Sequence, residues 1–376
     1  MKTAMQTRLE TTLARLIAIP SVTSNTAACF EIIKFVREEL APLGMHVVES
    51  ESGAAHPWFF ATTRNTLTPG VLLAAHLDVV PGPDAAFTLR KADGKLYGRG
   101  SYDMKLAAAC YIEFLKDHAH ELGQLDIGVL FTTDEEIGGD SMNEILATGL
   151  RPGVVFIPDG GGDWQIEARA KGFFGMELRA NGKAAHGSRP WEGDNALHRI
   201  MDMTQILRNE YPFEGPSGTT VAITGVTGGA AVNQIADSAS ALLDVRSFDA
   251  VALKNFELRA FELAAAYNVT ISINQSGKPV IFDKNHPSVT PFLRALQKAR
   301  NEPARYIDSY GGSDARYFAI YDIPCIIMEP YGGGRHAEDE WLLASDLGEY
   351  YRLIETWLLE EVPAAANVSL QEAAVN

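Results

Sequence analysis

Histidine and acidic residues follow two of the most apolar segments of the sequence, close to the point where each segment ends. His76 comes directly after the run 71–75, and the adjacent pair Glu135 and Glu136 closely follows the run 127–132. Continuous apolar runs of this length are typical of strands buried on both faces of a parallel sheet. Imidazole and carboxylate together suit zinc, cobalt or manganese better than calcium or magnesium. These residues therefore indicate a metal site at the ends of strands.

Two further apolar segments end in the same way. Asp159 follows the run 154–157, and the run 325–328 leads through a glycine-rich turn to His336. In an open α/β sheet, ligands bind beyond the carboxyl ends of the strands. We therefore expect the side chains after all four runs to meet in one crevice.

Two more aspartates lie close to these positions in the sequence. Asp78 is two residues after His76, so on an extended strand both side chains face the same side. A carboxylate placed there could orient a metal-bound imidazole. Asp103 lies in a tight turn, 98–105, that leads into a helix. Its carboxylate could bridge two cations or could merely cap that helix, and the residues alone leave both open.

The remaining candidates also have two interpretations each. Glu135 and Glu136 point in different directions, so one could bind metal while the other acts as a general base, or both could be solvated loop acids. His186 lies in a turn and is either functional or an ordinary surface residue. Arg246 ends an expected strand, where its planar guanidinium could hold a carboxylate or form a surface salt bridge.

Strands and helices alternate through the first part of the chain and again near its end. We expect strands at 47–50, 58–62, 71–75, 127–132, 154–157 and 325–328, and helices at 5–18, 27–41 and 104–119. This alternation predicts an α/β fold with a mostly parallel sheet and helices on both faces.

The middle of the chain has a different pattern. Strands at 173–180, 220–226, 240–245 and 269–274 and helices at 195–207 and 251–266 follow one another in the order β-α-β-β-α-β. That order is typical of an α+β, ferredoxin-like unit. We therefore predict an inserted domain at 170–284, with 1–169 and 285–376 forming the larger domain.

Composition excludes several functional classes. The chain has 376 residues, which suits two domains, and a formal net charge of −16 with no basic segment that would bind nucleic acid. No apolar run approaches the ~20 residues of a membrane span, and the N-terminus lacks a signal-peptide core. Three scattered cysteines suggest reduced thiols. We expect a cytoplasmic protein with no nucleic-acid or membrane partner. No phosphate-binding loop motif occurs.

The joint pattern resembles one family. The motifs are His76-x-Asp78, Gly98-Arg99-Gly100 with Asp103 and Lys105, Glu135-Glu136, Asp159 and His336, in this order. They resemble the dinuclear-zinc amidohydrolases and exopeptidases, a family that includes acetylornithine deacetylase, succinyl-diaminopimelate desuccinylase, aminoacylases and glutamate carboxypeptidases. The resemblance covers nearly the whole chain. It implies the zinc-exopeptidase fold, with the inserted domain serving as a lid and dimerisation domain.

The resemblance also implies roles for individual residues. One divalent ion, zinc or else cobalt or manganese, would be held by His76 and Asp159. The second would be held by Glu136 and His336, with Asp103 bridging the two. Glu135 would be the general base, Asp78 the acid behind His76, and His186 an oxyanion-stabilising residue for the partner subunit of a homodimer. Arg246, Asn233, Gly312 and Ser313 would hold the amino-acid end of the substrate.

This sequence departs from the family pattern at positions other than the proposed metal ligands. These departures weaken any inference of substrate specificity from the family. Ala75 and Leu106 stand where glycine is usual, and no tryptophan lies between Pro81 and Gly94. We expect metal-dependent hydrolysis of the amide bond of an N-acyl amino acid, with dipeptide or carboxypeptidase substrates as the alternative. A non-catalytic binder of amino-acid derivatives is disfavoured because it would not need Glu135 as a base. An enzyme with a single metal ion is disfavoured to about the same degree as the non-catalytic binder.

Overall fold

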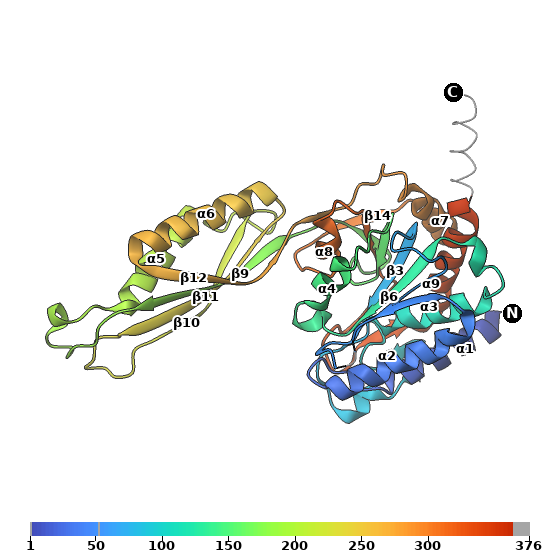
Figure 1. The fold of residues 1–376 in the computed structure, drawn as a ribbon, viewed down its shortest axis with the longest axis horizontal. Helices are drawn as coiled ribbons and strands as arrows, with labels where there is room; N and C mark the ends of the chain where they lie inside the picture. The colour runs from blue at the N-terminus through green and yellow to red at the C-terminus, as the bar shows by residue number, and fades with distance from the viewer. Residues whose placement is uncertain (1, 52, 364–376) are drawn as a thin grey trace, which may run out of the picture. The chain divides into compact units, whose positions relative to one another are not determined.

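The computed structural model describes residues 2–51 and 53–363. These residues form two compact units (Figure 1). Unit 1 contains the described residues up to Ala168, then Phe282–Asp308, and the chain from Ser313 onward. Unit 2 contains Arg169–Ile281 together with Ser309–Gly312. The short segment 309–312 thus packs with unit 2, whereas the sequence pattern had suggested that it belonged to the larger domain.

The main sheet of unit 1 has six strands. In spatial order they are β1 (His46–Glu49), β2 (Phe59–Thr62), β6 (Ile127–Thr132), β3 (Val71–His76), β7 (Val155–Ile157) and β15 (Cys325–Ile327). The four strands from β6 to β15 are parallel. At one edge β2 pairs antiparallel with β6, and β1 pairs antiparallel with β2. The expected mostly parallel sheet is confirmed. Because β6, β3, β7 and β15 run the same way, their carboxyl ends lie along one edge of the sheet.

Helices flank this sheet (Figure 1). They are α1 (Lys2–Ile17), α2 (Thr26–Leu40), α3 (Lys105–Asp117), α4 (Ser141–Ala147), α7 (Thr290–Arg300), α8 (Ala315–Ala319) and α9 (Ala344–Thr356), with a π-helical turn at Trp357–Glu361. Short 3₁₀ turns occur at Ala41–Leu43, Asp84–Phe87, Leu122–Gln124 and Glu135–Ile137. Every residue of β3 and β6 is buried, as the continuous apolar runs predicted.

Helix α3 begins just after the turn that carries Asp103, and its first residue anchors another helix. Lys105 is completely buried, and its ammonium group donates hydrogen bonds to the carbonyl oxygens of Leu16 (3.0 Å) and Ile19 (2.9 Å). Helix α1 also packs along α3 through its apolar stripe, which includes Leu9 and Leu13. The end of α1 therefore supports the start of α3 beside the candidate site.

Two small sheets were not predicted from the sequence. One has the order β16 (Gly332–Gly333), β17 (Trp341–Leu343), β5 (Lys95–Tyr97) and β4 (Arg90–Ala92). The other has the order β13 (Val280–Ile281), β8 (Gln165–Ala170) and β14 (Arg305–Ser309). Most of these strands have two or three residues, too few for a periodic pattern. The first sheet brings the Asp103 turn beside the segment that contains His336.

Unit 2 is built on a four-stranded antiparallel sheet. Its elements along the chain are β9 (Gly172–Asn181), a 3₁₀ turn (Pro190–Glu192), α5 (Ala196–Glu210), β10 (Thr220–Gly228), β11 (Ser238–Ser247), α6 (Ala250–Tyr267) and β12 (Val269–Gly277). The spatial order β10-β11-β9-β12 is that of a ferredoxin-like sheet. Both helices pack on one face of the sheet, where Ile200 and Phe256 meet Met176 and Leu243 in a buried core.

None of the helices in the described parts of the chain is both long enough and apolar enough to cross a membrane.

Candidate metal centre

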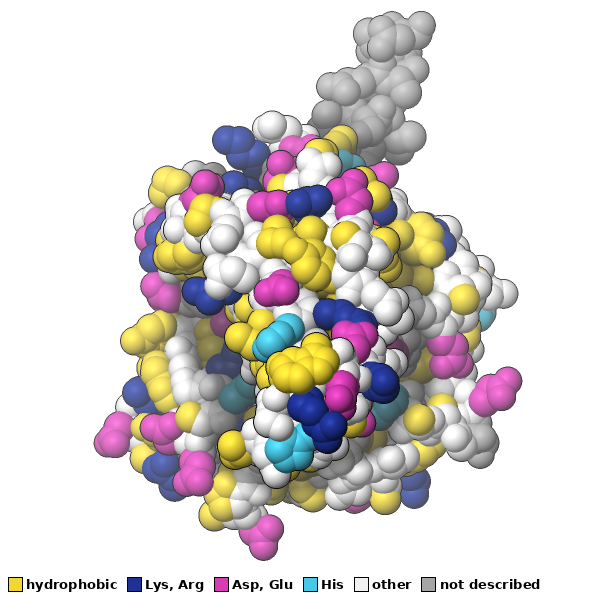
Figure 2. Space-filling view, turned by 90° about the vertical axis from the view of Figure 1, so that its left-hand side faces the viewer, with side chains coloured by type: hydrophobic (Ala, Val, Ile, Leu, Met, Phe, Trp, Pro, Cys, Tyr) yellow, Lys and Arg dark blue, Asp and Glu magenta, His cyan; other side chains and the backbone are white. Residues whose placement is uncertain are grey.

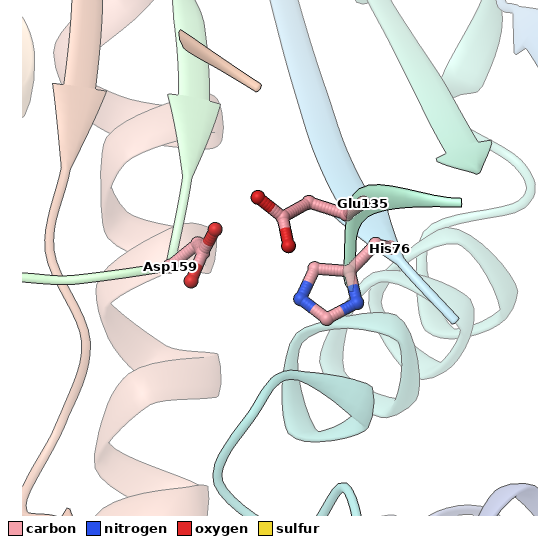
Figure 3. A group of neighbouring side chains, drawn as sticks. All are labelled: His76, Glu135 and Asp159. Atoms are coloured by element: carbon pink, nitrogen blue, oxygen red, sulfur yellow. The ribbon is translucent and has the colours of Figure 1, made fainter. Parts of the chain in front are cut away.

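Three of the predicted residues meet at the carboxyl edge of the main sheet. His76 is the last residue of β3, Glu135 starts the 3₁₀ turn after β6, and Asp159 lies two residues beyond β7. One potential ligand atom from each lies within 4.8 Å of the others. Figure 3 shows the three side chains pointing toward one another from their separate elements. The parallel strands therefore bring together residues that are far apart in sequence.

A second group consists of Asp103, Glu136 and His336, whose ligand atoms also lie within 4.8 Å of one another. The His336 Nε2 atom is 3.1 Å from Glu136 Oε2 and 3.3 Å from Asp103 Oδ2. The backbone of His336 adopts a left-handed conformation with φ 63°. Such a conformation is uncommon for residues other than glycine and occurs often at functional sites.

Asp103 connects the two groups. Its Oδ1 atom is 3.2 Å from His76 Nε2, while its Oδ2 atom is 3.3 Å from His336 Nε2. Ligands about 2.0–2.2 Å from a tetrahedral zinc ion lie roughly 3.3–3.6 Å from one another. The donor types and their spacing therefore fit two divalent cations that share the Asp103 carboxylate.

Asp78 supports residues of both groups from behind. Its carboxylate accepts hydrogen bonds from the Thr23 hydroxyl (2.8 Å) and from the backbone amides of Glu135 and Glu136 (both 3.2 Å). It also lies 3.5 Å from His76 Nδ1, which is 3.0 Å from the carbonyl oxygen of Asp78. With its proton on Nδ1, His76 donates to that carbonyl and keeps Nε2 free for a metal ion.

Electrostatics at the site favour a cation. Desolvation, followed by the nearby charge of Asp159, raises the pKa of Glu135 well above its ordinary value. Desolvation likewise raises the pKa of Glu136 to about 7, and the negative charge of Asp103 adds to that effect. Carboxylates crowded in a poorly solvated place repel one another, and a divalent cation relieves that repulsion.

Glu340 organises the turn that carries Asp103, a role that was not predicted from the sequence. Its buried carboxylate accepts hydrogen bonds from the backbone amides of Gly100 (3.0 Å), Tyr102 (2.9 Å) and Asp103 (3.0 Å) and from the Arg99 guanidinium (2.8 Å). Glu340 thus ties the Asp103 turn to the segment that contains His336.

Arg335 was also not predicted to belong to the site. Its Nη1 atom donates to Asp159 Oδ1 at 2.7 Å, and its Nη2 atom donates to Glu329 Oε2 at 2.6 Å. Its Nε atom is 3.6 Å from Asp103 Oδ2. The position of Arg335 directly before His336 was the only available signal in the sequence.

Ser313 and its neighbours lie at the start of α8 in unit 1. Ser313 is buried, its hydroxyl oxygen accepts a hydrogen bond from the Ala315 amide (3.4 Å), and its carbonyl oxygen accepts one from Arg316 (3.0 Å). Asp314 joins Glu135, His76 and Asp159 in lining a small enclosed cavity. The structure therefore places the start of α8 beside the first group of ligands.

The other predicted substrate residues belong to unit 2. The amide of Gly187, next to His186, donates to the carbonyl oxygen of Asn233 (2.7 Å), so the loops of His186 and Asn233 are adjacent. The His186 ring is exposed, and its Nδ1 atom lies 2.8 Å from the Ser188 hydroxyl.

Arg246 also belongs to unit 2, and its guanidinium already has partners there. It pairs in bidentate fashion with Asp244 (2.8 and 3.0 Å). It also donates to the carbonyl oxygen of Tyr310 (3.0 Å), two residues before the exposed Gly312. Arg246 and the segment that contains Gly312 are therefore neighbours within this unit.

Comparison with known proteins identifies the family. Residues 72–360 match the model of Peptidase family M20/M25/M40. The chain belongs to this family. A succinyl-diaminopimelate desuccinylase from Hahella chejuensis is 26% identical over 92% of the chain and 95% of that protein. A probable carboxypeptidase from Arthroderma otae is 31% identical, but over 50% of the chain and 45% of that protein.

Solved structures share the fold of this M20 protein. A Staphylococcus aureus tripeptidase has a TM-score of 0.74 at 23% identity, covering 94% of the chain and 97% of that structure. A Bacillus subtilis protein described as a dinuclear metal binding peptidase of the M20 family has a TM-score of 0.66 at 17% identity, with coverage of 95% and 98%. The expected family and fold are confirmed. The chain is a metallohydrolase that acts on amides or peptides.

Proposed function

We propose that this M20 hydrolase removes the acyl group from an N-acyl amino acid at a centre that holds two divalent metal ions. The observation that carries the proposal is the position of Asp103. Its two oxygens lie 3.2 Å from His76 Nε2 and 3.3 Å from His336 Nε2, one in each ligand group. A carboxylate shared between two imidazoles is suited to bridge two cations.

We assign His76 and Asp159 to one ion and Glu136 and His336 to the other. Glu135 lies within ligand distance of the first group, so geometry alone would allow it to bind metal too. We assign it instead as the general base, which is the role that the family resemblance implies for this position. Zinc is the first choice of metal, with cobalt or manganese as alternatives.

The proposed mechanism divides labour between the ions and the protein. When bound, the ions would polarise the amide carbonyl and make a water molecule more acidic. The Glu135 carboxylate would take a proton from the attacking water and return it to the leaving amine nitrogen. Asp78 would keep the His76 ring in place through the Nδ1 side, and Asp103 would hold both imidazoles at fixed positions.

The residues that we assign to the amino-acid end of the substrate are those that the family resemblance implies, with Ser313 in unit 1 and the others in unit 2. Arg246 would hold the free carboxylate of the substrate, helped by Asn233, Gly312 and Ser313, and would so position the scissile amide. His186 would stabilise the developing oxyanion of the partner subunit's reaction, which requires a homodimer.

The exposed face drawn in Figure 2 mixes acidic, basic and apolar side chains and includes histidines.

Deacylation is our first choice over peptide hydrolysis. The named desuccinylase aligns with 92% of the chain, whereas the probable carboxypeptidase aligns with 50%. The tripeptidase structure favours the alternative, hydrolysis of a short peptide, because it covers 94% of the chain. We propose a cytoplasmic location, since all three cysteines are buried and free of disulfide bonds.

The test pairs two adjacent variants, Glu135→Gln and Glu136→Gln. The protein is stripped with a chelator and restored with zinc, cobalt or manganese. Amine release is then measured on N-acetyl, N-formyl and N-succinyl amino acids and on dipeptides. We expect Glu135→Gln to lose about 10²–10⁴-fold in kcat while binding as much metal as the parent protein. We expect Glu136→Gln to lose one ion.

Three outcomes would contradict parts of this proposal. Full activity of Glu135→Gln would reject its role as base. Loss of one ion in that variant would make Glu135 a ligand. Preference for dipeptides over every N-acyl amino acid would replace deacylation with the peptidase alternative.

A further inference from the structure

An ionic network around Arg335 contacts Asp159, a proposed ligand of the first ion only, more closely than any proposed ligand of the second ion. The Arg335 guanidinium donates to Asp159 Oδ1 (2.7 Å) and to Glu329 Oε2 (2.6 Å). In the described parts of the chain, no lysine or arginine side chain forms a salt bridge with Glu136. The Arg335 Nε atom also lies 3.6 Å from Asp103 Oδ2, on the carboxylate that we assign to both ions. The cation therefore hydrogen-bonds directly to a ligand of the first ion alone and contacts the ligands of the second ion only through the shared Asp103.

Glu329 and Tyr102 hold the Arg335 guanidinium in this place. The side chain of Glu329 is 5% exposed, and its second oxygen accepts a hydrogen bond from the Tyr102 hydroxyl. The Tyr102 ring packs against the backbone of Gly332, where even a methyl group would clash with it. If Arg335 moved away, Glu329 would remain as a buried carboxylate without a cationic partner, which is strongly unfavourable.

We propose that Arg335 is a positioning residue that makes the two proposed metal sites unequal, so that the Asp159 site binds its ion more weakly than the Glu136–His336 site. This inference rests on the dimetal centre of the proposed function. The guanidinium occupies one oxygen of Asp159 and leaves the other for an ion. Its positive charge also repels a divalent ion at that carboxylate more than it repels one at Glu136.

Coulomb's law predicts whether each variant binds metal more or less tightly, because like charges repel most strongly at short distance in a poorly solvated site. Removing the positive charge with Arg335→Gln should strengthen binding at the weaker site. Removing the negative charge with Glu329→Gln should leave Arg335 less neutralised and weaken binding there. The double variant removes both charges, so its metal affinity at the weaker site should be close to that of the parent protein.

The experiment measures metal binding rather than catalysis. The full-length, chelator-stripped protein is titrated with Zn²⁺ by calorimetry at pH 8, and with Co²⁺ by absorption. The variants are Arg335→Gln, Arg335→Lys, Glu329→Gln and Arg335→Gln/Glu329→Gln. Arg15→Gln is the control, because Arg15 is an exposed residue that pairs with Glu39 on the outer helices.

We expect two unequal sites in the parent protein. In Arg335→Gln the weaker site should bind about tenfold or more tightly, and in Glu329→Gln about tenfold or more weakly. The stronger site should change less than threefold in both variants. Arg335→Lys keeps the charge but loses the planar fork, so its affinities should stay near those of the parent protein. Arg15→Gln should match the parent.

Opposite signs in two neighbouring variants would not arise from simple loss of structure. Weaker binding in both Arg335→Gln and Arg335→Lys would overturn the inference in favour of a purely geometric role. Two equal sites in the parent, or no change in any variant, would also overturn it while leaving the dimetal proposal intact. If the parent protein bound no divalent ion, the proposed function itself would fail. If Arg335→Gln did not fold, Glu329→Gln would still provide a signed test.

Discussion

At the scale of single residues, the candidate centre depends on acids that themselves bind no metal in our assignment. Glu340 is the clearest example, because one carboxylate receives three backbone amides and a guanidinium. Those amides belong to the turn that ends in Asp103. The position of the proposed bridging carboxylate is therefore set by a residue four positions after His336, more than 230 residues later in the chain.

Replacing Glu340 by Gln should disrupt this turn. The amide NH₂ group would face backbone N–H donors, and the buried Arg99 would lose its anionic partner. We expect the free energy of unfolding to fall by about 2–4 kcal/mol and kcat to fall with it. Urea denaturation and amine-release assays measure the two effects. Glu338→Gln, at an exposed position in the same segment, is the matched control and should change neither. An unchanged unfolding midpoint in Glu340→Gln would contradict this role.

Apart from Asp103, the ligand candidates could be recognised from the sequence because each follows a segment with a strong apolar pattern. His76 ends an apolar run, and Asp159 closely follows another, so parallel pairing alone predicts that they meet. Arg335 and Glu340 could not be recognised in this way. Their partners, Asp159 and the Asp103 turn, are 176 and 237 residues distant. No local pattern encodes contacts over such separations.

At the scale of elements, short turns after strands set the direction of the side chains proposed to be catalytic or metal-binding. The 3₁₀ turn Glu135–Ile137 is closed by Gly138 and Gly139, both with positive φ. At Gly139, where φ is 62°, a methyl group would clash with the carboxylate of Asp314 at the start of α8. This glycine therefore allows the turn and α8 to approach each other closely.

Gly139→Ala should strain that approach. We expect a loss of about 1–3 kcal/mol in the free energy of unfolding, from the left-handed backbone and the contact with Asp314 together. We also expect lower kcat, because the turn carries Glu135 and Glu136. Gly123→Ala serves as control, since that position has open space and no positive φ. Equal stability of the two variants, measured by thermal unfolding, would show that the turn tolerates the methyl group.

The two small sheets could not be predicted from the sequence. The long buried strands and the β-α-β-β-α-β order could be read from hydrophobic periodicity. Strands such as β16 and β5, with two and three residues, have no periodicity to read, and they exist because their partners lie beside them. They nevertheless align the Asp103 turn with the His336 segment.

At the scale of the whole molecule, the ligand set is confined to unit 1. All five proposed ligands and Glu135 lie in its described residues, while unit 2 has a separate core around Ile200 and Phe256. A ligand that binds only the folded form stabilises it by about 2.7 kcal/mol when its concentration is 100 times Kd. We expect metal binding to raise the free energy of local unfolding mainly in unit 1, because that unit contains the proposed ligands.

Hydrogen exchange provides the measurement. Adding Zn²⁺ to stripped protein should slow amide exchange in the turns 100–104 and 134–139, where amides bond to Glu340 and Asp78. Exchange in the core of β9 and β11 should change little. The Glu135→Gln variant should show the same pattern, because it is expected to retain both ions. Equal protection of both units would indicate that the ions act on the molecule as a whole.

The order of the ligands along the chain has a consequence for biosynthesis. His76, Asp103, Glu136 and Asp159 all precede unit 2, whereas His336 follows it, as do Arg335 and Glu340. A ribosome must therefore translate unit 2 completely before the second proposed ion has its full set of donors. A chain interrupted anywhere within unit 2 would carry the crowded carboxylates without His336 or the Arg335 cation. Complete metal loading thus requires translation past unit 2.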